Sequence, residues 1–143
     1  MSIIATDLDG TIFKGKTLID GVKEGIIEII NKGIEIYYTT NNSSQTPSEI
    51  KDKLEYLLQL NIDISRIITP LVIFQNLYSN NKSNIFIYGS DNLKNYIKNL
   101  NMNVTSLENA ELVLIGRKEE NNYSEINEII KNVSLGKIGR AHV

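Results

Sequence analysis

Two aspartates one residue apart, Asp7 and Asp9, form the most chemically informative cluster in the sequence. They lie at the end of an apolar segment, Ser2 to Leu8, which we expect to be a strand buried on both faces, and Gly10 and Thr11 follow. A spacing of two on an extended chain sends both carboxylates to the same side. Carboxylates this close repel each other unless a cation lies between them or one holds a proton. The pattern predicts a magnesium site on Asp7 and Asp9, with one carboxylate as nucleophile and the other as acid and base.

A second polar cluster, Thr39 to Ser44, lies at the end of the next predicted strand, Gly33 to Thr40. Its hydroxyls and backbone N–H groups precede a helix predicted from Pro47, and such groups can hold phosphate oxygens. On its own the cluster is better explained as an ordinary polar loop in a chain that is rich in asparagine. The carboxyl ends of consecutive parallel strands lie at one edge of a sheet, so we expect the two clusters to converge. Together they indicate a site for a phosphorylated ligand.

The rest of the chain alternates between strand and helix patterns. Apolar residues recur at helical spacing from Val22, and Gly33 stands where a helix-ending glycine is expected. Thr46 can cap the next helix, which has Pro47 at its first position. This alternation predicts an α/β fold with a parallel sheet. The further predicted elements are strands at 67–69, 84–88 and 111–115 and helices at 70–79, 91–100 and 123–133.

The composition excludes several other kinds of chemistry. The chain of 143 residues has no cysteine, which excludes a disulfide framework, a thiolate nucleophile and a cysteine-bound zinc. Its 15 Lys and Arg residues nearly balance its 17 Asp and Glu residues, which argues against nucleic acid as a partner. No apolar stretch approaches the roughly 20 residues of a membrane span, so we expect a cytoplasmic protein that makes no membrane contact.

The two clusters together resemble a known family. Asp7-Leu8-Asp9-Gly10-Thr11, followed by Thr40-Asn41-Asn42-Ser43, is similar to the haloacid dehalogenase superfamily of phosphatases. The resemblance is closer to the class IIA, NagD-like branch, which includes p-nitrophenyl phosphatase-like enzymes, and it runs through nearly all of residues 2–137. It implies a Mg²⁺-dependent phosphatase that acts on a small phosphorylated metabolite.

The resemblance also implies a role for each motif residue. Asp7 would be the nucleophile that forms an aspartyl phosphate, and Asp9 would protonate the leaving group and then activate water. The Asp7 carboxylate and the Asp9 backbone carbonyl would bind Mg²⁺. The residues implied to bind the substrate phosphate are Gly10, Thr40, Asn41 and Asn42.

For the domain organisation, the resemblance implies a partial Rossmann-like core over residues 1–83 and the first part of an inserted α/β cap over 84–137. In the full-length protein the cap can carry a homo-oligomer interface. The family places a lysine and a further acidic metal-binding motif downstream of the cap, and nothing before residue 138 supplies them in order. Arg117 and Lys118 stand where the branch usually has an acidic residue. If the first strand is central, as in the family, its missing neighbours leave a backbone edge and apolar faces uncovered, so we expect residues 1–137 alone to be weakly stable. A site without its lysine and third carboxylate holds magnesium poorly, so we also expect no appreciable turnover.

The last six residues, Ile138 to Val143, match one reading frame of a widely used short-read sequencing adapter. We expect them not to be native, and we expect the sequence to be a C-terminally truncated fragment.

Two alternative interpretations stay open. Gly10 to Thr17 fits the P-loop pattern G-x-x-x-x-G-K-[ST], which predicts a nucleotide-binding protein with a helix from Lys16. We favour a flap hairpin here that turns near Gly15, with Ile12, Phe13, Leu18 and Ile19 packing it down. The second alternative is a non-catalytic, phosphate-binding remnant that uses the same pocket.

Overall fold

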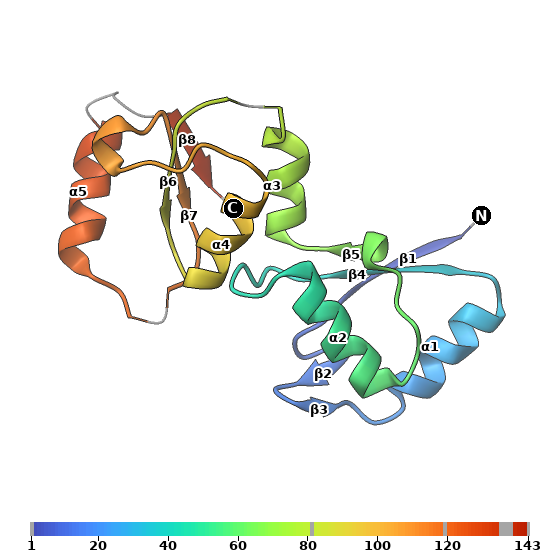
Figure 1. Ribbon diagram of the computed structural model, residues 1–143. Helices are drawn as coiled ribbons and strands as arrows, with labels where there is room; N and C mark the ends of the chain where they lie inside the picture. Colours follow the sequence, from blue (N-terminus) through green and yellow to red (C-terminus); the bar gives the residue numbers. More distant parts are fainter. Residues whose placement is uncertain (1, 81, 119, 135–138, 143) are drawn as a thin grey trace. The chain divides into compact units, whose positions relative to one another are not determined.

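The computed structural model describes residues 2–80, 82–118, 120–134 and, as backbone, 139–142 (Figure 1). These residues divide into two compact units, one formed by Met1–Asn41 with Pro47–Pro70 and the other by Asn42–Thr46 with Leu71–Val143. Each unit contains a parallel sheet with helices packed on it, which confirms the predicted α/β class with a Rossmann-like parallel sheet. None of the helices in the described ranges is both long and apolar enough to cross a membrane.

The first unit is built on a three-stranded parallel sheet in the order β1-β4-β5. Its strands are β1 (Ile3–Asp7), β4 (Glu35–Thr39) and β5 (Ile67–Ile68). Helix α1 (Val22–Asn31) joins the first two strands, and α2 (Pro47–Leu58) with a short 3₁₀ turn, η1 (Ile64–Arg66), leads to the third. The chain leaves α1 through Gly33, whose φ of 68° lies in the left-handed region, so the predicted helix-ending glycine is confirmed.

Both helices of this unit pack on the face of the sheet that carries Ile36 and Tyr38. Because side chains alternate along a strand, the carboxylate-bearing position 7 lies on the other face, with its register partner Thr39. The buried residues of this core are Leu8, Ile12, Phe13, Ile26, Ile36, Tyr38, Ile50, Leu54, Leu58, Ile62 and Ile67.

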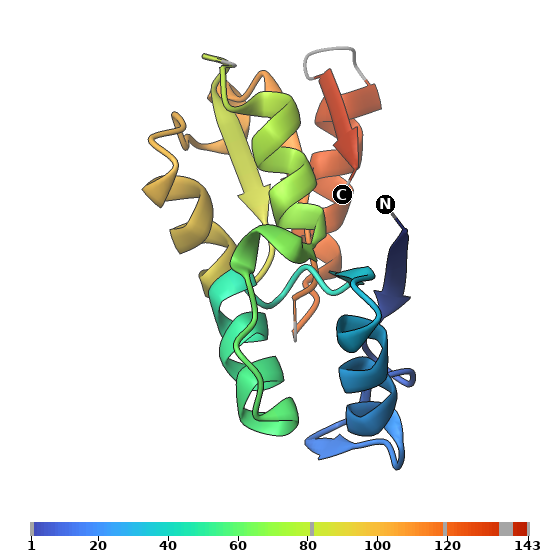
Figure 2. The same ribbon diagram turned by 90° about the vertical axis from the view of Figure 1, so that its right-hand side faces the viewer.

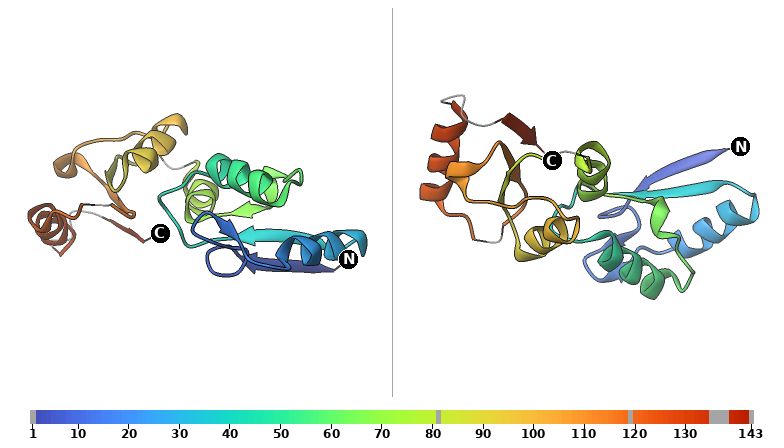
Figure 3. Two further views of the ribbon diagram at one scale, coloured as in Figure 1. Left: turned by 90° about the horizontal axis from the view of Figure 1, so that it is seen from below. Right: turned by 45° about the horizontal axis from the view of Figure 1, so that its top comes forward.

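The expectation that the first strand is buried on both faces is wrong for the described structure. Ile3 is 59% exposed and Ile4 is 36% exposed, while the paired residue Ile36 on β4 is only 3% exposed. The reason is position: β1 is the edge of the described sheet and pairs with β4 alone, as the left view of Figure 3 shows. Continuous apolar runs are typical of strands with neighbours on both sides. The sequence of β1 therefore has the pattern of an interior strand, but β1 occupies an edge.

A small antiparallel hairpin follows β1, formed by β2 (Phe13–Lys14) and β3 (Thr17–Leu18). The turn contains Gly15, whose φ is 61°, as two-residue hairpin turns require. Ile12 and Phe13 are each only 2% exposed, and the Lys53 ammonium lies 3.4 Å from the centroid of the Phe13 ring. The predicted flap hairpin is confirmed.

The second unit has a parallel sheet in the order β6-β7-β8. Its strands are β6 (Ile85–Tyr88), β7 (Leu112–Ile115) and β8 (Gly139–His142). Its helices are α3 (Pro70–Tyr78), α4 (Asp91–Asn99), the 3₁₀ turn η2 (Leu107–Asn109) and α5 (Tyr123–Ser134). The backbone of β8 belongs to the six residues that we expect not to be native, and their origin stays a prediction.

Helices cover both faces of this second sheet. Ile85 and Ile87 pack with α3 and α4, and Figure 2 shows α3 lying alongside β6. On the other face, Tyr88 and Val113 pack with Leu107 of η2 and with α5. Helices α4 and α5 therefore lie on opposite faces of the sheet (Figure 1).

The compact units differ from the two segments expected from the sequence. The division falls after Pro70, because Leu71 and Phe74 of α3 are buried in the core of the second sheet. Residues 42–46 also group with the second unit. The assignment of 1–83 to a catalytic core and of 84–137 to a cap stays a prediction.

Candidate active site

The two aspartates at the end of β1 lie on either side of a buried residue, Leu8. Leu8 is only 1% exposed, and its carbonyl oxygen accepts hydrogen bonds from the backbone N–H groups of Thr11, Ile12 and Phe13, at 3.3, 2.9 and 3.2 Å. Asp7 and Asp9, on either side of it, are exposed. The chain can turn this tightly because Gly10 has a φ of 89°, a conformation that side chains other than glycine rarely adopt. The sequence therefore buries one residue here and presents two carboxylates.

The second polar cluster begins at the same edge of the sheet. Asp7 and Thr39 are register partners in the β1–β4 ladder, and the Thr39 hydroxyl donates a hydrogen bond of 3.1 Å to the carbonyl oxygen of Thr6. The Thr40 N–H donates to the carbonyl oxygen of Ile68 at 3.1 Å, which ties the end of β4 to β5. The exposed residue Asn41 comes next. The structure therefore brings the end of β1 and the start of the Thr40 cluster together, as expected; the roles of the individual residues stay predictions.

Asn42 is placed differently from the other predicted site residues, because it belongs to the second unit. Its side-chain oxygen accepts hydrogen bonds from the N–H and the hydroxyl of Ser44, at 2.9 and 2.6 Å. Its side-chain nitrogen donates to Gln45 at 3.3 Å. This arrangement is an Asx turn that shapes the loop. The structure thus assigns Asn42 a local structural role, while its predicted phosphate contact stays a prediction.

The two carboxylates suit a hard cation. Within the described ranges, neither Asp7 nor Asp9 forms an ion pair. Magnesium takes oxygen ligands and is commonly bound by one or two carboxylates, with water and substrate phosphate completing the octahedron. The donor set at Asp7 and Asp9 fits that ion. The described residues contain no group of three or more acidic or histidine side chains that could hold a metal.

Sequence reasoning did not single out one polar contact that shapes the loop after Asn41. The Ser43 hydroxyl is buried and accepts a hydrogen bond of 3.1 Å from the backbone N–H of Arg117. This contact holds residues 42–46 against the end of β7. No local signal could have predicted it, because the two residues are 74 positions apart in the chain.

The P-loop interpretation does not agree with the structure. A P-loop requires a helix to begin at its Gly-Lys-Thr residues, here from Lys16, so that the helix N-terminus faces the phosphates. Here Thr17 lies in β3 of the hairpin, and α1 begins only at Val22. Gly10 to Thr17 therefore forms a hairpin packed on the core, and nucleotide binding by this segment is not favoured.

Comparison with known proteins supports the predicted family. The profile of the family described as haloacid dehalogenase-like hydrolase matches residues 4–103. An acid sugar phosphatase of Staphylococcus haemolyticus is 33% identical over 124 residues, which cover 84% of this chain and 46% of that protein. The chain thus spans about half the length of the curated relatives that it matches.

Solved structures show the same fold. A p-nitrophenyl phosphatase from Archaeoglobus fulgidus superposes with a TM-score of 0.85 at 19% identity, over 99% of this chain and 54% of that one. A glycerol phosphate phosphatase from Mycobacterium tuberculosis, solved in complex with magnesium, gives a TM-score of 0.75 at 19% identity, over 94% of this chain and 41% of that one. With the family profile matching over more than half of the chain, and with two carboxylates at the end of β1, this chain belongs to the haloacid dehalogenase-like hydrolases.

Proposed function

We propose that the protein hydrolyses a small-molecule phosphate monoester through an aspartyl phosphate formed on Asp7. The observation that carries this proposal is the register of the parallel ladder, in which Asp7 and Thr39 are partners. This register brings the exposed residue Asp7 to the sheet edge at which the Thr40 and Asn41 cluster begins, and Asp9 follows two residues later. Family membership supports the reaction class.

The reaction needs two displacements at phosphorus. In the first, a carboxylate oxygen of Asp7 bonds to phosphorus while the bond to the leaving alcohol breaks, and Asp9 gives its proton to the leaving oxygen. In the second, Asp9 takes a proton from a water molecule as that water bonds to phosphorus. The bond to Asp7 then breaks, and inorganic phosphate leaves.

The proposed cofactor is Mg²⁺, held by the Asp7 carboxylate and the Asp9 backbone carbonyl. When bound, it offsets the charge repulsion between the carboxylates and the approaching phosphate dianion. For the phosphate oxygens we propose the Gly10 backbone, Thr40, Asn41 and Asn42. Catalysis of phosphoryl transfer depends mainly on such positioning and charge stabilisation.

The proposed substrates are small phosphorylated metabolites. The names of the similar proteins, an acid sugar phosphatase and a glycerol phosphate phosphatase, support phosphorylated sugars and polyols as the compounds to test first. For the full-length protein, we also propose that the cap segment carries any homo-oligomer interface.

Phosphate binding without turnover is a second candidate for the 143-residue chain by itself. It is favoured because, among the described residues, no three acidic or histidine side chains lie close enough together to hold a metal ion, and no lysine forms an ion pair with Asp7 or Asp9. Two carboxylates without a third protein ligand or a neighbouring lysine bind magnesium weakly. The chain alone would then bind its ligand and release no product.

Phosphate release from p-nitrophenyl phosphate, measured with and without Mg²⁺, tests the proposal. We expect Mg²⁺-dependent release by the complete translation product of the gene, and loss of that release with Asp7→Asn. Asp20→Asn, an exposed carboxylate outside the site, is the matched control and should leave the release unchanged. Release that survives Asp7→Asn would overturn the assignment. For the 143-residue chain alone we expect no release, but trapping of beryllium fluoride that Asp7→Asn abolishes.

A further inference from the structure

The second sheet reverses its strand order between β6 and β7. After β6 the chain passes through α4, and Val104 then pairs in parallel with Ile85. Ile85 also pairs with Leu112 of β7, so Val104 and β7 lie on opposite edges of β6. The connection after β7 passes through α5, on the other face of the sheet. In open parallel sheets, such a reversal opens a crevice beyond the carboxyl ends of the two strands, and ligands bind there.

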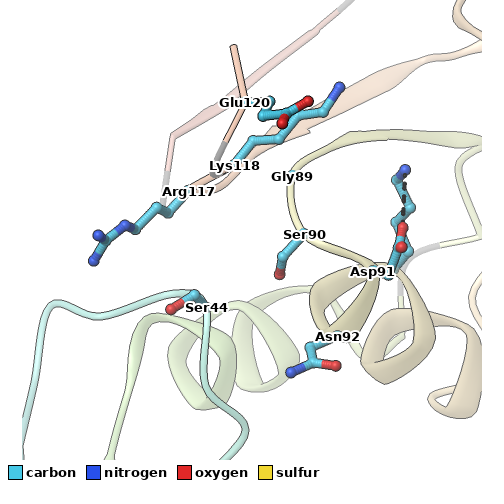
Figure 4. A pocket seen from close by; sticks show the side chains of 9 residues that line it. Ser44, Gly89, Ser90, Asp91, Asn92, Arg117, Lys118 and Glu120 are labelled. Atoms are coloured by element: carbon cyan, nitrogen blue, oxygen red, sulfur yellow. Dashed lines mark ion pairs between the residues drawn. The ribbon is translucent and has the colours of Figure 1, made fainter.

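A cavity of about 440 Å³ lies at this place. It is lined by the segment that follows β6, from Gly89 to Asn92, by Arg117 and Lys118 after β7, and by Ser44. Figure 4 shows Ser44, Ser90, Asn92 and Arg117 around it. All of these residues belong to the second unit, so the cavity is defined within one compact body.

The backbone N–H and carbonyl groups of Arg117 both form hydrogen bonds with residues of other segments. Its N–H donates to the Ser43 hydroxyl at 3.1 Å, and its carbonyl oxygen accepts from the Ser90 N–H at 3.1 Å. One residue earlier, the Gly116 N–H donates to the carbonyl oxygen of Tyr88 at 2.8 Å. These bonds join the two strand ends and the loop at 42–46. The Arg117 side chain therefore starts from a fixed backbone position.

Two glycines allow α4 to approach the strand ends this closely. A Cβ atom at Gly89 would lie 2.6 Å from Cδ2 of Leu93, and one at Gly116 would lie 2.4 Å from the same atom. Leu93 is only 1% exposed, so it has little space in which to move away. The cavity is therefore a consequence of close packing between α4 and both strands.

Three cationic side chains line the cavity, and within the described ranges two of them, both lysines, form ion pairs. Lys94 pairs with Asp91 at 3.5 Å, and Lys118 pairs with Glu125 at 2.9 Å. The hydrogen bond from Lys118 to Glu125 raises the pKa of Lys118, so Lys118 stays charged and engaged. Within the described ranges, the Arg117 guanidinium has no hydrogen bond and no ion pair.

The balance of charge in the cavity depends on that arginine. Lys94, Arg117 and Lys118 line it together with two carboxylates, Asp91 and Glu120. Without Arg117 the cations and carboxylates would be equal in number. The positive end of the α4 dipole adds to the field of the guanidinium at the same place.

We propose that this cavity binds a small oxyanion, a phosphate or carboxylate group, with the Arg117 guanidinium and the Ser90 hydroxyl as its donors. The planar fork of an arginine matches two oxygens of such a group. The Ser90 oxygen accepts a hydrogen bond from the Leu93 N–H at 3.3 Å, which leaves the hydroxyl proton for a ligand. None of the residues that line this cavity is among those proposed to bind Mg²⁺ or the substrate phosphate, and oxyanion binding here does not require hydrolysis.

Backbone amide NMR spectra of the 16.1 kDa chain test this proposal residue by residue. Inorganic phosphate and glycerol phosphate are titrated separately. We expect saturable shifts of the amides at 89–92 and 117–118, with a dissociation constant of about 1 mM or below. Equal responses to both probes mean that the site takes the free ion, and a response to the ester alone means that it binds the group as part of a metabolite. Absence of saturable shifts at these amides with either probe overturns the proposal.

Variants separate a specific site from general charge attraction. Arg117→Gln keeps the backbone bonds of residue 117 and should weaken binding by about tenfold or more, since a charge-assisted hydrogen bond is lost. Lys98→Gln removes the same charge from the exposed end of α4, outside this cavity, and should change binding less than about twofold. Equal effects of the two variants would overturn the proposal. In Asp7→Asn, shifts at 89–92 should persist even where shifts at 9–11 are lost, so the two sites can fail independently.

Discussion

Asp7 and Thr39 face each other as register partners at the carboxyl ends of two parallel strands. The hydroxyl of Thr39 is not directed to a ligand, because it donates a hydrogen bond of 3.1 Å to the carbonyl oxygen of Thr6. This bond ties β4 to β1 one residue before the aspartate. It gives Thr39 the role of holding the two strand ends together. The proposed phosphate contacts therefore do not include Thr39.

Thr39→Val should loosen this strand pair, since valine has the shape of threonine without the hydroxyl. Loss of one hydrogen bond costs about 1 kcal/mol, so amide exchange at 4–6 and 37–39 should become about fivefold faster. Thr17→Val in the exposed strand of the hairpin is the control, and it should leave exchange at these amides unchanged. Unchanged protection in Thr39→Val would show that the hydroxyl does not hold the strands.

Asp9→Asn should separate the two steps assigned to the aspartates. In the complete translation product, loss of the proton donor should lower turnover of alkyl phosphates by about 10²- to 10⁴-fold. The loss should be smaller for p-nitrophenyl phosphate, because its leaving group needs little protonation. Beryllium fluoride trapping at Asp7 should survive in Asp9→Asn. An equal loss for both leaving groups would contradict the role of Asp9 as the acid.

Two glycines of the first unit should respond to alanine in opposite directions. Gly10 has a φ of 89° with open space around it, so Gly10→Ala strains the backbone without a clash and should destabilise the unit by about 1–2 kcal/mol. Gly25 lies within α1, also in open space, so Gly25→Ala should stabilise it by about 0.5–1 kcal/mol. Urea unfolding followed at amides of β4 measures both. Destabilisation of equal size by both variants would contradict this account.

Gly116→Ala should be costly because its new Cβ would meet Leu93 at 2.4 Å. We expect about 1–3 kcal/mol, the usual cost of overpacking. Leu93→Ala removes the obstructing atoms and should itself cost about 2–5 kcal/mol. The double variant should be more stable than the sum of the two costs predicts, by about 0.5–3 kcal/mol. Unfolding followed at amides 85–88 measures this coupling, and strict additivity would show that Leu93 is not the obstacle.

The local stability of the short turn η1 should depend on pH through the ionisation of Asp63. The Ser65 backbone N–H, at 2.9 Å from the Asp63 carboxylate, lowers the pKa of Asp63, because the bond favours the ionised form. Because the pKa of Asp63 is lower in the folded than in the unfolded state, its ionised form stabilises the fold. This contribution is fully present above the unfolded-state pKa of about 3.9, and it is lost as the pH falls through the folded-state pKa. Amide exchange at Ser65 should therefore lose protection in acid. Asp63→Asn keeps an acceptor and should remove this pH dependence.

The amino-acid sequence by itself determined the features that depend on local pattern. The spacing of apolar residues predicted the alternation of strands and helices, Gly33 predicted the end of α1, and the motif around Asp7 and Asp9 predicted the family. The elements and the helix end depend on residues within a few positions of one another, where backbone geometry allows few conformations. The family resemblance also needed the Thr40-Asn41-Asn42-Ser43 motif, but each of the two motifs is itself a local pattern. The hairpin at Gly15 belongs to this group too, since its turn residue lies between the two short strands that it joins.

Only the tertiary structure decided which partners these elements have. The apolar pattern of β1 did not show that Ile3 and Ile4 are exposed, because burial of a strand depends on which strands and helices lie beside it. It did not show that α3 packs on the second sheet, or that Ser43 accepts a bond from Arg117. The crevice between β6 and β7 likewise follows from strand order and from the faces on which α4 and α5 pack. Contacts between residues far apart in the chain depend on how all the elements pack together, so they cannot be predicted from a local pattern of residues.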